Sequence, residues 1–411
     1  AFWALGMGLG ARLGRSAETR AAGMALGLLG IDVLRSYVFT GFPWVLFGHI
    51  WIGTPVAQAA AYVGPLGLRA LTLTLAVAPW LVARPNRRWI AEAVAGLALL
   101  ALWQAGEARL SAPLAPRDPP INLRLVQPNA PQALKWLPEY ALDFFYRHLD
   151  LTAEEPAPGK PRPDLIVWPE TAVPFLLNDP GQGLRMVAEA AGGVPVALGI
   201  QRAEGARYYN SLAVIGADGA IGPVYDKHHL VPFGEYIPWG DQLARIGISA
   251  FAAQQGNGYS AGPGPRLIDL GRLGHPLPLI CYEAVFPQDI RRAPARPDWL
   301  LQITNDAWFG EVSGPWQHLA QARLRAIEFG LPLARAANTG VSAMIDARGE
   351  VVAELGMGQQ GVIDAALPPA LPATLYARIG DLPLVAFFAA IASLIYLIAR
   401  RYRVDPAKPR G

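Results

Sequence analysis

Hydrophobic and polar positions divide this chain into apolar stretches near its two ends and a mixed middle section. Four apolar stretches have about the length that a helix rising 1.5 Å per residue needs to cross a bilayer, and they are 21–39, 66–82, 89–106 and 382–399. Residues 2–9 have the pattern of the last turns of another hydrophobic helix. The pattern predicts a membrane protein with an α-helical transmembrane bundle.

Residues 40–65 interrupt this pattern. Thr40-Gly41-Phe42-Pro43-Trp44 breaks the first span, and the residues after it are only mildly apolar. We interpret 40–65 as an interfacial segment. Before it, Asp32 and Arg35 are three positions apart, so they share one helical face and can pair there or face other helices.

The middle section alternates short apolar runs with amphipathic pieces. The runs have strand length, and they are 121–126, 165–167, 194–200, 211–215, 277–280, 300–303, 341–345 and 351–352. Helix-like pieces, such as 134–151, 183–191 and 316–329, separate them. Residues 216–219 and 346–349 have the composition of hairpin turns. Strands that alternate with helices predict a layered α/β domain.

Arginine clusters at 11–20, 84–88 and 400–403 flank the apolar stretches. The positive-inside rule places all three clusters in the cytoplasm with one topology, which leaves the middle section on the extracytoplasmic face. We therefore divide the chain into transmembrane helices (1–106), a linker (107–120), an α/β domain (121–365), a second linker (366–381), a last transmembrane helix (382–399) and a cytoplasmic tail (400–411).

Composition supports a membrane protein and excludes other classes. Hydrophobic residues make up 52% of the chain and charged residues only 16%. The net charge is +3, and because the arginines cluster beside apolar segments we expect no nucleic-acid partner. No zinc-type Cys/His spacing and no phosphate-binding P-loop occur, so we predict no metal and no cofactor. The chain begins with Ala1 inside an apolar run, so we expect its first helices to lie upstream of this numbering.

The only cysteine, Cys281, follows the apolar run 277–280. A lone cysteine is either a small buried hydrophobe or a reactive thiol, and a strand end is a place where folds expose nucleophiles. Taken singly, Glu170 fits a capping carboxylate and Lys227 a surface lysine. Together the three residues supply the parts of a cysteine acyltransferase, since a thiol needs a base and a tetrahedral intermediate needs donors for its oxyanion.

Three motifs give these residues a family resemblance. Trp168-Pro169-Glu170, Asp226-Lys227-His228 and Cys281-Tyr282-Glu283 resemble, in this order, the Glu, Lys and Cys motifs of the carbon–nitrogen hydrolase (nitrilase) superfamily. The resemblance covers 121–365 and implies an αββα sandwich. The flanking spans narrow it to the apolipoprotein N-acyltransferase family, which has more spans than we count here. Further stretches are similar to that family, namely 40–44, 127–129, 232–238, 305–310 and 337–340.

The resemblance implies a ping-pong acyl transfer at a bacterial inner membrane, by a multi-pass protein with its catalytic domain on the periplasmic face. A phospholipid would donate its sn-1 acyl chain to Cys281, with Glu170 as base and with Lys227 and the Tyr282 N–H at the oxyanion. The α-amine of a diacylglyceryl apolipoprotein would then accept the chain from the thioester. The expected partners are these two substrates and membrane lipid, and the expected state is a monomer without a cofactor.

The resemblance also implies supporting residues, each with a simpler alternative. Glu235 is expected to orient the lysine, although a turn residue fits the same pattern. Glu283 is expected in the site, although a carboxylate at a helix start fits as well. Asn305 and Asp306 follow a strand end, where they can shape the pocket or cap a helix.

Aromatic residues are expected to line the entry for the acyl chain. They are Trp136, Tyr236, Tyr282 and Trp308, and packing in an aromatic core is the alternative for each. The long apolar loops 233–251 and 308–316 are expected to act as membrane-facing lids.

The sequence also allows two rival functions. A membrane-tethered amidase acting on a small amide would use the same three residues, but it would not need the flanking spans or the segment 40–44. An inactive scaffold that binds lipoproteins would not need all three catalytic positions to be occupied. His228 and His229 are alternative bases, and Glu170 is preferred over both.

Overall fold

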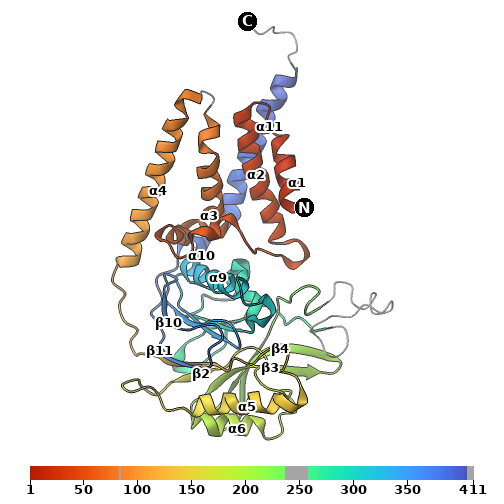
Figure 1. Cartoon of the computed structure of the whole chain (residues 1–411), viewed down its shortest axis with the longest axis vertical. Helices are drawn as coiled ribbons and strands as arrows, with labels where there is room; N and C mark the ends of the chain where they lie inside the picture. The colour runs from red at the N-terminus through yellow and green to blue at the C-terminus, as the bar shows by residue number, and fades with distance from the viewer. Residues whose placement is uncertain (83–84, 237–257, 405–411) are drawn as a thin grey trace. The chain divides into compact units, whose positions relative to one another are not determined.

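The computed structural model describes residues 1–82, 85–236 and 258–404 (Figure 1). The chain divides into two compact units, one formed by 1–113 with 373–411 and the other by 114–372. Residues 405–411 of the predicted tail (400–411) and residues 237–251 of the predicted lid (233–251) lie outside the described residues.

The unit 114–372 is built on two β-sheets. The first has six strands in the order β11-β1-β2-β3-β4-β5, and the second has five in the order β10-β9-β8-β7-β6. The strands are β1 (Asn122–Gln127), β2 (Leu165–Val167), β3 (Val196–Glu204), β4 (Arg207–Ile215), β5 (Ile221–Asp226), β6 (Leu277–Ile280), β7 (Leu300–Thr304), β8 (Leu333–Ala337), β9 (Ser342–Ile345), β10 (Val351–Leu355) and β11 (Gly361–Ala366). In each sheet three neighbouring strands are parallel, β1-β2-β3 in one and β6-β7-β8 in the other. Parallel strands end at the same edge, so each sheet brings its strand ends together.

Helices cover the outer faces of this sandwich. They are α5 (Pro138–Ala153), α6 (Gly183–Ala191) and α9 (Gly314–Phe329), and the short helix α8 (Pro287–Arg291) follows Val285. One apolar core joins both sheets, with Leu125 and Leu212 from the first and Ile303 and Met344 from the second. A second core packs α5 and α6 against the first sheet, and Figure 1 shows these two helices together below β2 and β3. The predicted α/β fold is confirmed, and its layers follow the αββα order.

Both predicted hairpin turns are present in this unit. Residues 216–219 join the antiparallel strands β4 and β5, and 346–349 join β9 and β10. Short 3₁₀ helices flank two strands of the unit. η6 (Gly271–Leu273) precedes β6, η7 (Cys281–Val285) follows it, and η8 (Asp306–Phe309) follows β7.

The other unit is helical. Its helices are α1 (Phe2–Ala11), α2 (Ala17–Arg35), α3 (Ala60–Val77), α4 (Arg88–Ser111), α10 (Leu375–Ile379) and α11 (Leu382–Val404). Within the described residues, two helical stretches are long and apolar enough to cross a membrane, Pro55–Leu81 and Arg88–Ser111. The predicted span 21–39 corresponds to α2, which carries several charged residues, and the apolar part of α11 is shorter, Leu382–Leu397. By length and composition, therefore, two of the four predicted spans are supported.

The predicted interfacial segment consists of short helical pieces. They are η1 (Val38–Thr40), η2 (Phe47–Trp51) and η3 (Pro55–Ala59), and η4 (Ala78–Leu81) and η5 (Pro85–Arg87) follow later. Helix α3 begins at Ala60, earlier than the predicted start at 66. Gly64, with a φ of 64°, and Pro65 break its regular path, which is why the sequence pattern placed the start after them.

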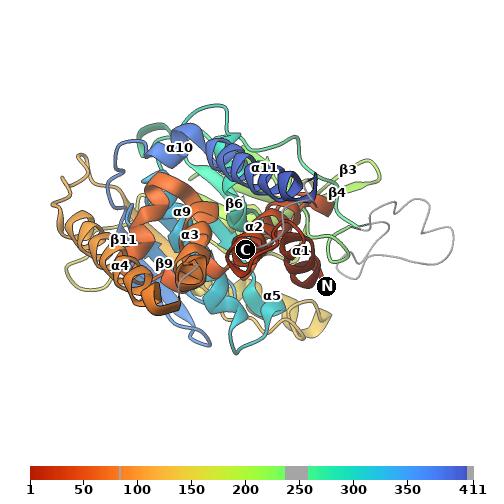
Figure 2. The same cartoon turned by 90° about the horizontal axis from the view of Figure 1, so that it is seen from above.

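Glycines allow α1 and α2 to pack closely, side by side in both views (Figure 1, Figure 2). A Cβ atom built on Gly10 would lie 2.0 Å from the carbonyl oxygen of Gly23, and one on Gly27 would lie 2.0 Å from that of Gly6. Small residues at such a crossing let the two backbones approach each other. The expected pairing of Asp32 with Arg35 is present, at 2.8 Å between Oδ1 and Nη1.

Candidate active site

Cys281 is the first residue after β6 and opens η7. Its side chain is buried, and its backbone has a φ of 52°, a left-handed conformation that costs energy for a residue with a Cβ. The sharp turn from strand to helix fixes where the thiol points. The predicted strand end at Cys281 is confirmed.

Glu170 and Lys227 come from the other sheet. Glu170 lies just after β2, next to Thr171 with a φ of 47°, and Lys227 directly follows β5. The Lys227 Nζ lies 3.6 Å from Glu170 Oε1, and both side chains are buried. Cys281 contacts the Thr304 side chain, and the backbone N–H of the next residue, Asn305, donates to Glu170 at 2.9 Å, so the three side chains lie in one cluster. The structure thus brings together the three residues that the motifs single out.

Glu170 is held by two further groups. The amide of Asn210, on β4, donates to Oε1 at 2.7 Å, and the backbone N–H of Asn305 donates to Oε2 at 2.9 Å. Asn305 in turn accepts from the Asn338 amide at 3.0 Å and donates to Gln132 at 2.6 Å. The backbone of Asn305 therefore orients the proposed base, and its side chain ties the surrounding loops together.

Burial sets the protonation of the thiol and the carboxylate. Burial raises the pKa of the Cys281 thiol well above its usual range, the Glu170 carboxylate raises it further, and Lys227 opposes both. Burial also raises the pKa of Glu170, which Lys227 partly offsets. Burial lowers the pKa of Lys227, but Glu235 and Glu170 together raise it above its ordinary value. The resting site thus holds a neutral thiol, an ammonium and a carboxylate with increased basicity.

Glu235 lies directly against Lys227. Its Oε1 accepts from Lys227 Nζ at 2.8 Å and from the Asn210 amide at 3.3 Å, and its Oε2 accepts from the backbone N–H of Val231 at 2.8 Å. This geometry agrees with a residue that orients the lysine. It also closes the loop 231–235, so the alternative of a turn residue describes the same contacts.

Glu283 is completely buried and joins two chain segments. It accepts from the backbone N–H of Ile280 at 2.8 Å, and from those of His228 and His229 at 2.8 and 3.2 Å. Tyr225 donates its hydroxyl to it at 2.9 Å. Glu283 is therefore both a helix-start carboxylate of η7 and a link between the residue before Cys281 and the residues after Lys227.

The two histidines pair with carboxylates. His228 Nδ1 lies 2.6 Å from Glu283 Oε1, and His229 Nδ1 lies 2.6 Å from Asp289 Oδ2. Burial lowers the pKa of His228, but the carboxylates of Asp289 and Glu283 raise it to about 9. His228, His229 and Asp289 offer nitrogen and oxygen atoms within 4.8 Å of one another, and both histidines use ring nitrogens for these contacts with carboxylates.

Asp306 belongs to a buried network that the sequence did not suggest. His318 Nε2 lies 3.1 Å from the carbonyl oxygen of Cys281, and His318 Nδ1 lies 2.8 Å from Asp306 Oδ1. Arg335 donates to Asp306 Oδ2 at 2.5 Å. Although burial opposes it, Arg335 and His318 hold the pKa of Asp306 below its usual value. Through His318, the network contacts the backbone carbonyl of Cys281.

The aromatic residues expected at the entry differ in exposure. Trp308 is 62% exposed, and Trp136 and Tyr236 are half-buried. Tyr282 is buried, with its ring edge-on to Phe286 at 4.9 Å between centroids. Three of the four can therefore meet a substrate, whereas the Tyr282 ring packs in the core and leaves the backbone N–H as its candidate contribution.

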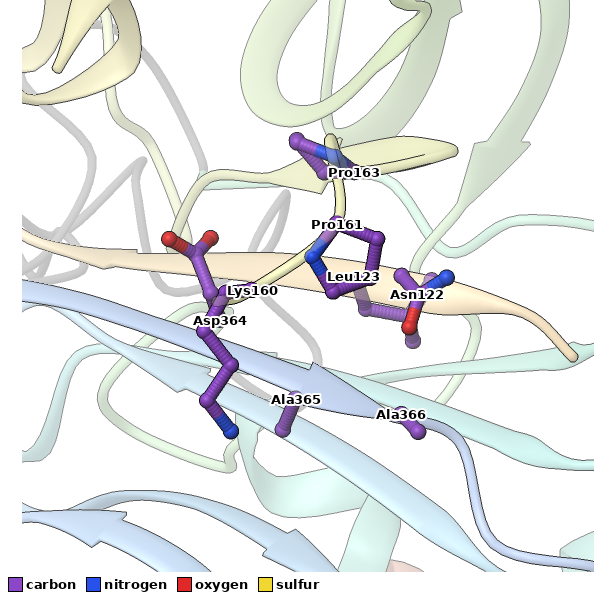
Figure 3. Close-up of a pocket in the computed structure, with 8 residues that line it drawn as sticks. All are labelled: Asn122, Leu123, Lys160, Pro161, Pro163, Asp364, Ala365 and Ala366. Carbon is purple, nitrogen blue, oxygen red and sulfur yellow. The ribbon is translucent and has the colours of Figure 1, made fainter. Parts of the chain in front are cut away.

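A separate pocket lies at the edge of the first sheet (Figure 3). It is lined by Asn122, Leu123, Lys160, Pro161, Pro163, Asp364, Ala365 and Ala366. None of these residues belongs to the cluster around Cys281. The Asp364 carboxylate in its wall is paired with Arg124 at 2.8 Å, so we assign the pocket no role in the reaction.

Known proteins match both units of the chain. Residues 122–375 match the carbon–nitrogen hydrolase family, and residues 1–78 match the apolipoprotein N-acyltransferase N-terminal domain. Among solved structures, an amidase from Nesterenkonia sp. is 20% identical with a TM-score of 0.44, over 68% of this chain and 100% of that one.

Closer relatives cover almost the whole chain. The apolipoprotein N-acyltransferase of Bradyrhizobium diazoefficiens is 39% identical over 99% of this chain and 78% of its own length. The enzyme of the same name from Rhodopseudomonas palustris is 39% identical over 97% of this chain and 77% of its own length. The one from Sinorhizobium fredii is 41% identical over 90% of this chain and 72% of its own length. The family predicted from the three motifs and the flanking apolar stretches is confirmed, and the chain belongs to the apolipoprotein N-acyltransferase family.

Proposed function

We propose that this chain transfers the sn-1 acyl chain of a phospholipid to the α-amine of the N-terminal S-diacylglyceryl-cysteine of an apolipoprotein. The transfer passes through a thioester on Cys281. The observation that carries the proposal is the buried cluster of Glu170, Lys227 and Cys281 in a chain of this family. A nucleophile, a base and an oxyanion donor are the minimum that acyl transfer through cysteine requires.

Acylation begins when Glu170 takes the proton of the Cys281 thiol. The sulfur attacks the ester carbonyl carbon, a C–S bond forms, and the carbonyl oxygen becomes an oxyanion. The Lys227 ammonium and the backbone N–H of Tyr282 donate to that oxyanion. The ester C–O bond then breaks, the leaving glycerol oxygen takes the proton from Glu170, and the lysophospholipid departs.

Transfer to the acceptor reuses the same groups. The neutral α-amine attacks the thioester carbonyl and gives a proton to Glu170, while Lys227 and Tyr282 again stabilise the oxyanion. The C–S bond breaks, the amide forms, and Glu170 returns the proton to the Cys281 thiolate. A thioester is a better acyl donor to an amine than the original ester, so the covalent intermediate lowers the barrier of the second step.

Supporting residues position these groups and receive the lipids. Glu235 holds the ammonium of Lys227, and Asn305 holds the carboxylate of Glu170. Trp136, Tyr236 and Trp308 line the entry of the acyl chain. The second predicted lid, residues 308–316, includes the exposed side chains of Val312 and Trp316, which suit contact with lipid.

The helical unit carries the membrane part of the proposal. We infer that α1, α2, α3, α4 and α11 belong to a multi-pass bundle in the bacterial inner membrane, with the α/β unit on the periplasmic face. The apolar stretches Pro55–Leu81 and Arg88–Ser111 support it, as do the arginine clusters in the sequence. Both substrates are lipids, so a site at a membrane surface suits them. We propose that the chain acts as a monomer.

The deciding experiment measures the intact mass of the purified chain after incubation with phospholipid. We expect an increase of one acyl group, lost on treatment with hydroxylamine and absent from Cys281→Ser. Addition of a diacylglyceryl lipopeptide should remove the adduct and yield N-acylated peptide. No adduct with any phospholipid tested, combined with release of ammonia from small amides, would instead support the amidase alternative.

A further inference from the structure

Lys135 is a buried lysine beside the active site, in the turn between β1 and α5. The chain contains 35 Lys and Arg residues, of which only four are lysines. The side chain of Lys135 is only 4% exposed, and within the described residues it forms no ion pair at contact distance. Burial of an ammonium group without a direct partner is costly, so its presence calls for a reason.

The contacts of Lys135 converge on the turn that carries Glu170. Its Nζ donates to the carbonyl oxygen of Glu170 at 3.2 Å and to the Thr171 hydroxyl at 3.3 Å. Thr171 is the residue with the strained φ of 47°. The ammonium thus bridges two consecutive residues at a turn whose backbone needs support. The ammonium also lies over the ring of Trp136, whose centroid is 5.3 Å from Nζ, in a cation–π contact.

The charges around Glu170 explain why a cation suits this position. Burial raises the pKa of Glu170, Lys227 lowers it, Glu235 raises it, and Lys135 lowers it. Burial lowers the pKa of Lys135 to about 8, with Glu170 opposing, so the group carries its charge at neutral pH. Among the described residues, the other titratable groups that act on this cluster include Cys281, Tyr259, His148 and Asp306.

A charge balance follows from these groups. Glu170 and Glu235 contribute two negative charges, and Lys227 and Lys135 contribute two positive charges. With Lys135 the buried cluster is neutral when the base is ionised. Without Lys135 the cluster would carry a net negative charge in a buried place, and protonation of Glu170 would relieve it.

We propose that Lys135 is a positioning residue that keeps Glu170 ionised and oriented as the base for Cys281. The proposal rests on the proposed roles of Glu170 and Cys281. Lys135 acts through Glu170, since its hydrogen bonds go to the Glu170 carbonyl and the Thr171 hydroxyl. It holds the Glu170–Thr171 turn by two hydrogen bonds and supplies the charge that compensates Glu235. The buried cluster would thus use two lysines for two tasks, Lys227 for the oxyanion and Lys135 for the base.

The test measures how fast iodoacetamide alkylates the thiol as a function of pH. Because Cys281 is the only cysteine, the full-length chain in detergent reports on it alone. We compare Lys135→Met, which removes charge and hydrogen bonds, with Lys135→Gln, which removes the charge and keeps N–H donors. Lys135→Arg keeps the charge. Lys160→Met is the control, since Lys160 is an exposed lysine of the same unit, at the pocket in Figure 3.

We expect the midpoint of the alkylation profile to rise by about one pH unit in Lys135→Met and in Lys135→Gln, a usual size for the loss of a neighbouring charge. Lys135→Arg and Lys160→Met should keep the wild-type midpoint. In a Glu170→Gln background the effect of Lys135→Met should shrink, because the base through which it acts is gone. If Lys135→Met does not fold, Lys135→Gln gives the same answer.

A wild-type midpoint in Lys135→Met, or in Lys135→Gln if only that variant folds, overturns the proposal, even where thermal stability falls. If Lys135→Gln keeps the wild-type midpoint while Lys135→Met does not, Lys135 acts only through its hydrogen bonds. This outcome overturns its electrostatic role. Alkylation needs no lipid, so these outcomes are independent of the acyl adduct. A chain with the expected midpoints and no adduct from any phospholipid would refute the proposed function and leave the role of Lys135 intact.

Discussion

The ammonium of Lys227 lies 2.8 Å from Glu235 Oε1, within direct hydrogen-bonding distance. The same nitrogen lies 3.6 Å from Oε1 of Glu170. Two buried carboxylates therefore compete for one cation, and Glu235 holds it more closely. This difference leaves Glu170 less tightly paired and better able to accept a proton.

Replacement of Glu235 by Gln should disturb this division. Lys227 would turn to Glu170, and loss of the negative neighbour would itself favour ionised Glu170, so the pKa of Glu170 should fall. A base with a lower pKa is a weaker one. We expect the rate of acyl-enzyme formation to drop about 10- to 100-fold, since hydrogen bonds to charged groups contribute about 1.5–3 kcal/mol. Single-turnover mass spectrometry measures this rate, and an unchanged rate would contradict the assignment of Glu235.

The pH dependence of acylation should report on Glu170. Burial raises the pKa of this carboxyl. Glu170 is active as a base only when ionised, so the rate should fall as the pH is lowered through its raised pKa, above the usual range of glutamate. Glu170→Gln should lose this acidic limb and about 10²- to 10⁴-fold in rate. A limb that persists unchanged in Glu170→Gln would assign the titration to another group.

The sequence identified the reacting residues better than the groups that support them. Glu170 and Cys281 stand just after strands that are visible in the apolar pattern, and Lys227 is marked by its short motif. Lys135 gives no such signal, because its burial depends on how the β1–α5 turn packs against residues 35 positions away. His318 and Arg335 are charged or polar positions in a helix and a strand, where local patterns predict exposure.

Three strands were missing from the predicted pattern for physical reasons. Strand β5 contains Gly222 and Pro223, and β11 begins with Gly361, residues that weaken a strand signal. Strand β8 is Leu-Ala-Arg-Ala-Ala, in which alanine has low β propensity and Arg335 interrupts the apolar run. Each of them is fixed by pairing with neighbours in the sheet, which is tertiary information.

The buried pair of Asp306 and Arg335 should matter for stability. Both side chains are fully buried, so Asp306→Asn would leave the Arg335 charge without its partner. We expect a loss of about 3–5 kcal/mol in the free energy of unfolding of the α/β unit. The control is Glu204→Gln, which breaks the exposed pair with Arg202 and should cost less than about 1 kcal/mol. Denaturant unfolding followed by tryptophan fluorescence measures the free energy of unfolding of both variants. Equal losses would show that the buried pair contributes no more to stability than the exposed one.

The glycine contact between α1 and α2 makes the helical unit sensitive to a single methyl group. A Cβ on Gly10 would lie 2.0 Å from the Gly23 carbonyl oxygen, so Gly10→Ala must push the two helices apart. A Cβ on Gly8, on the same helix, would meet nothing within 4 Å. Gly8→Ala should therefore be neutral or stabilise the helix by up to about 1 kcal/mol, because alanine is the better helix former. We expect thermal unfolding in detergent to occur at a lower temperature for Gly10→Ala and not for Gly8→Ala. Equal unfolding temperatures for the two variants would mean that α1 does not pack on α2 through its glycines.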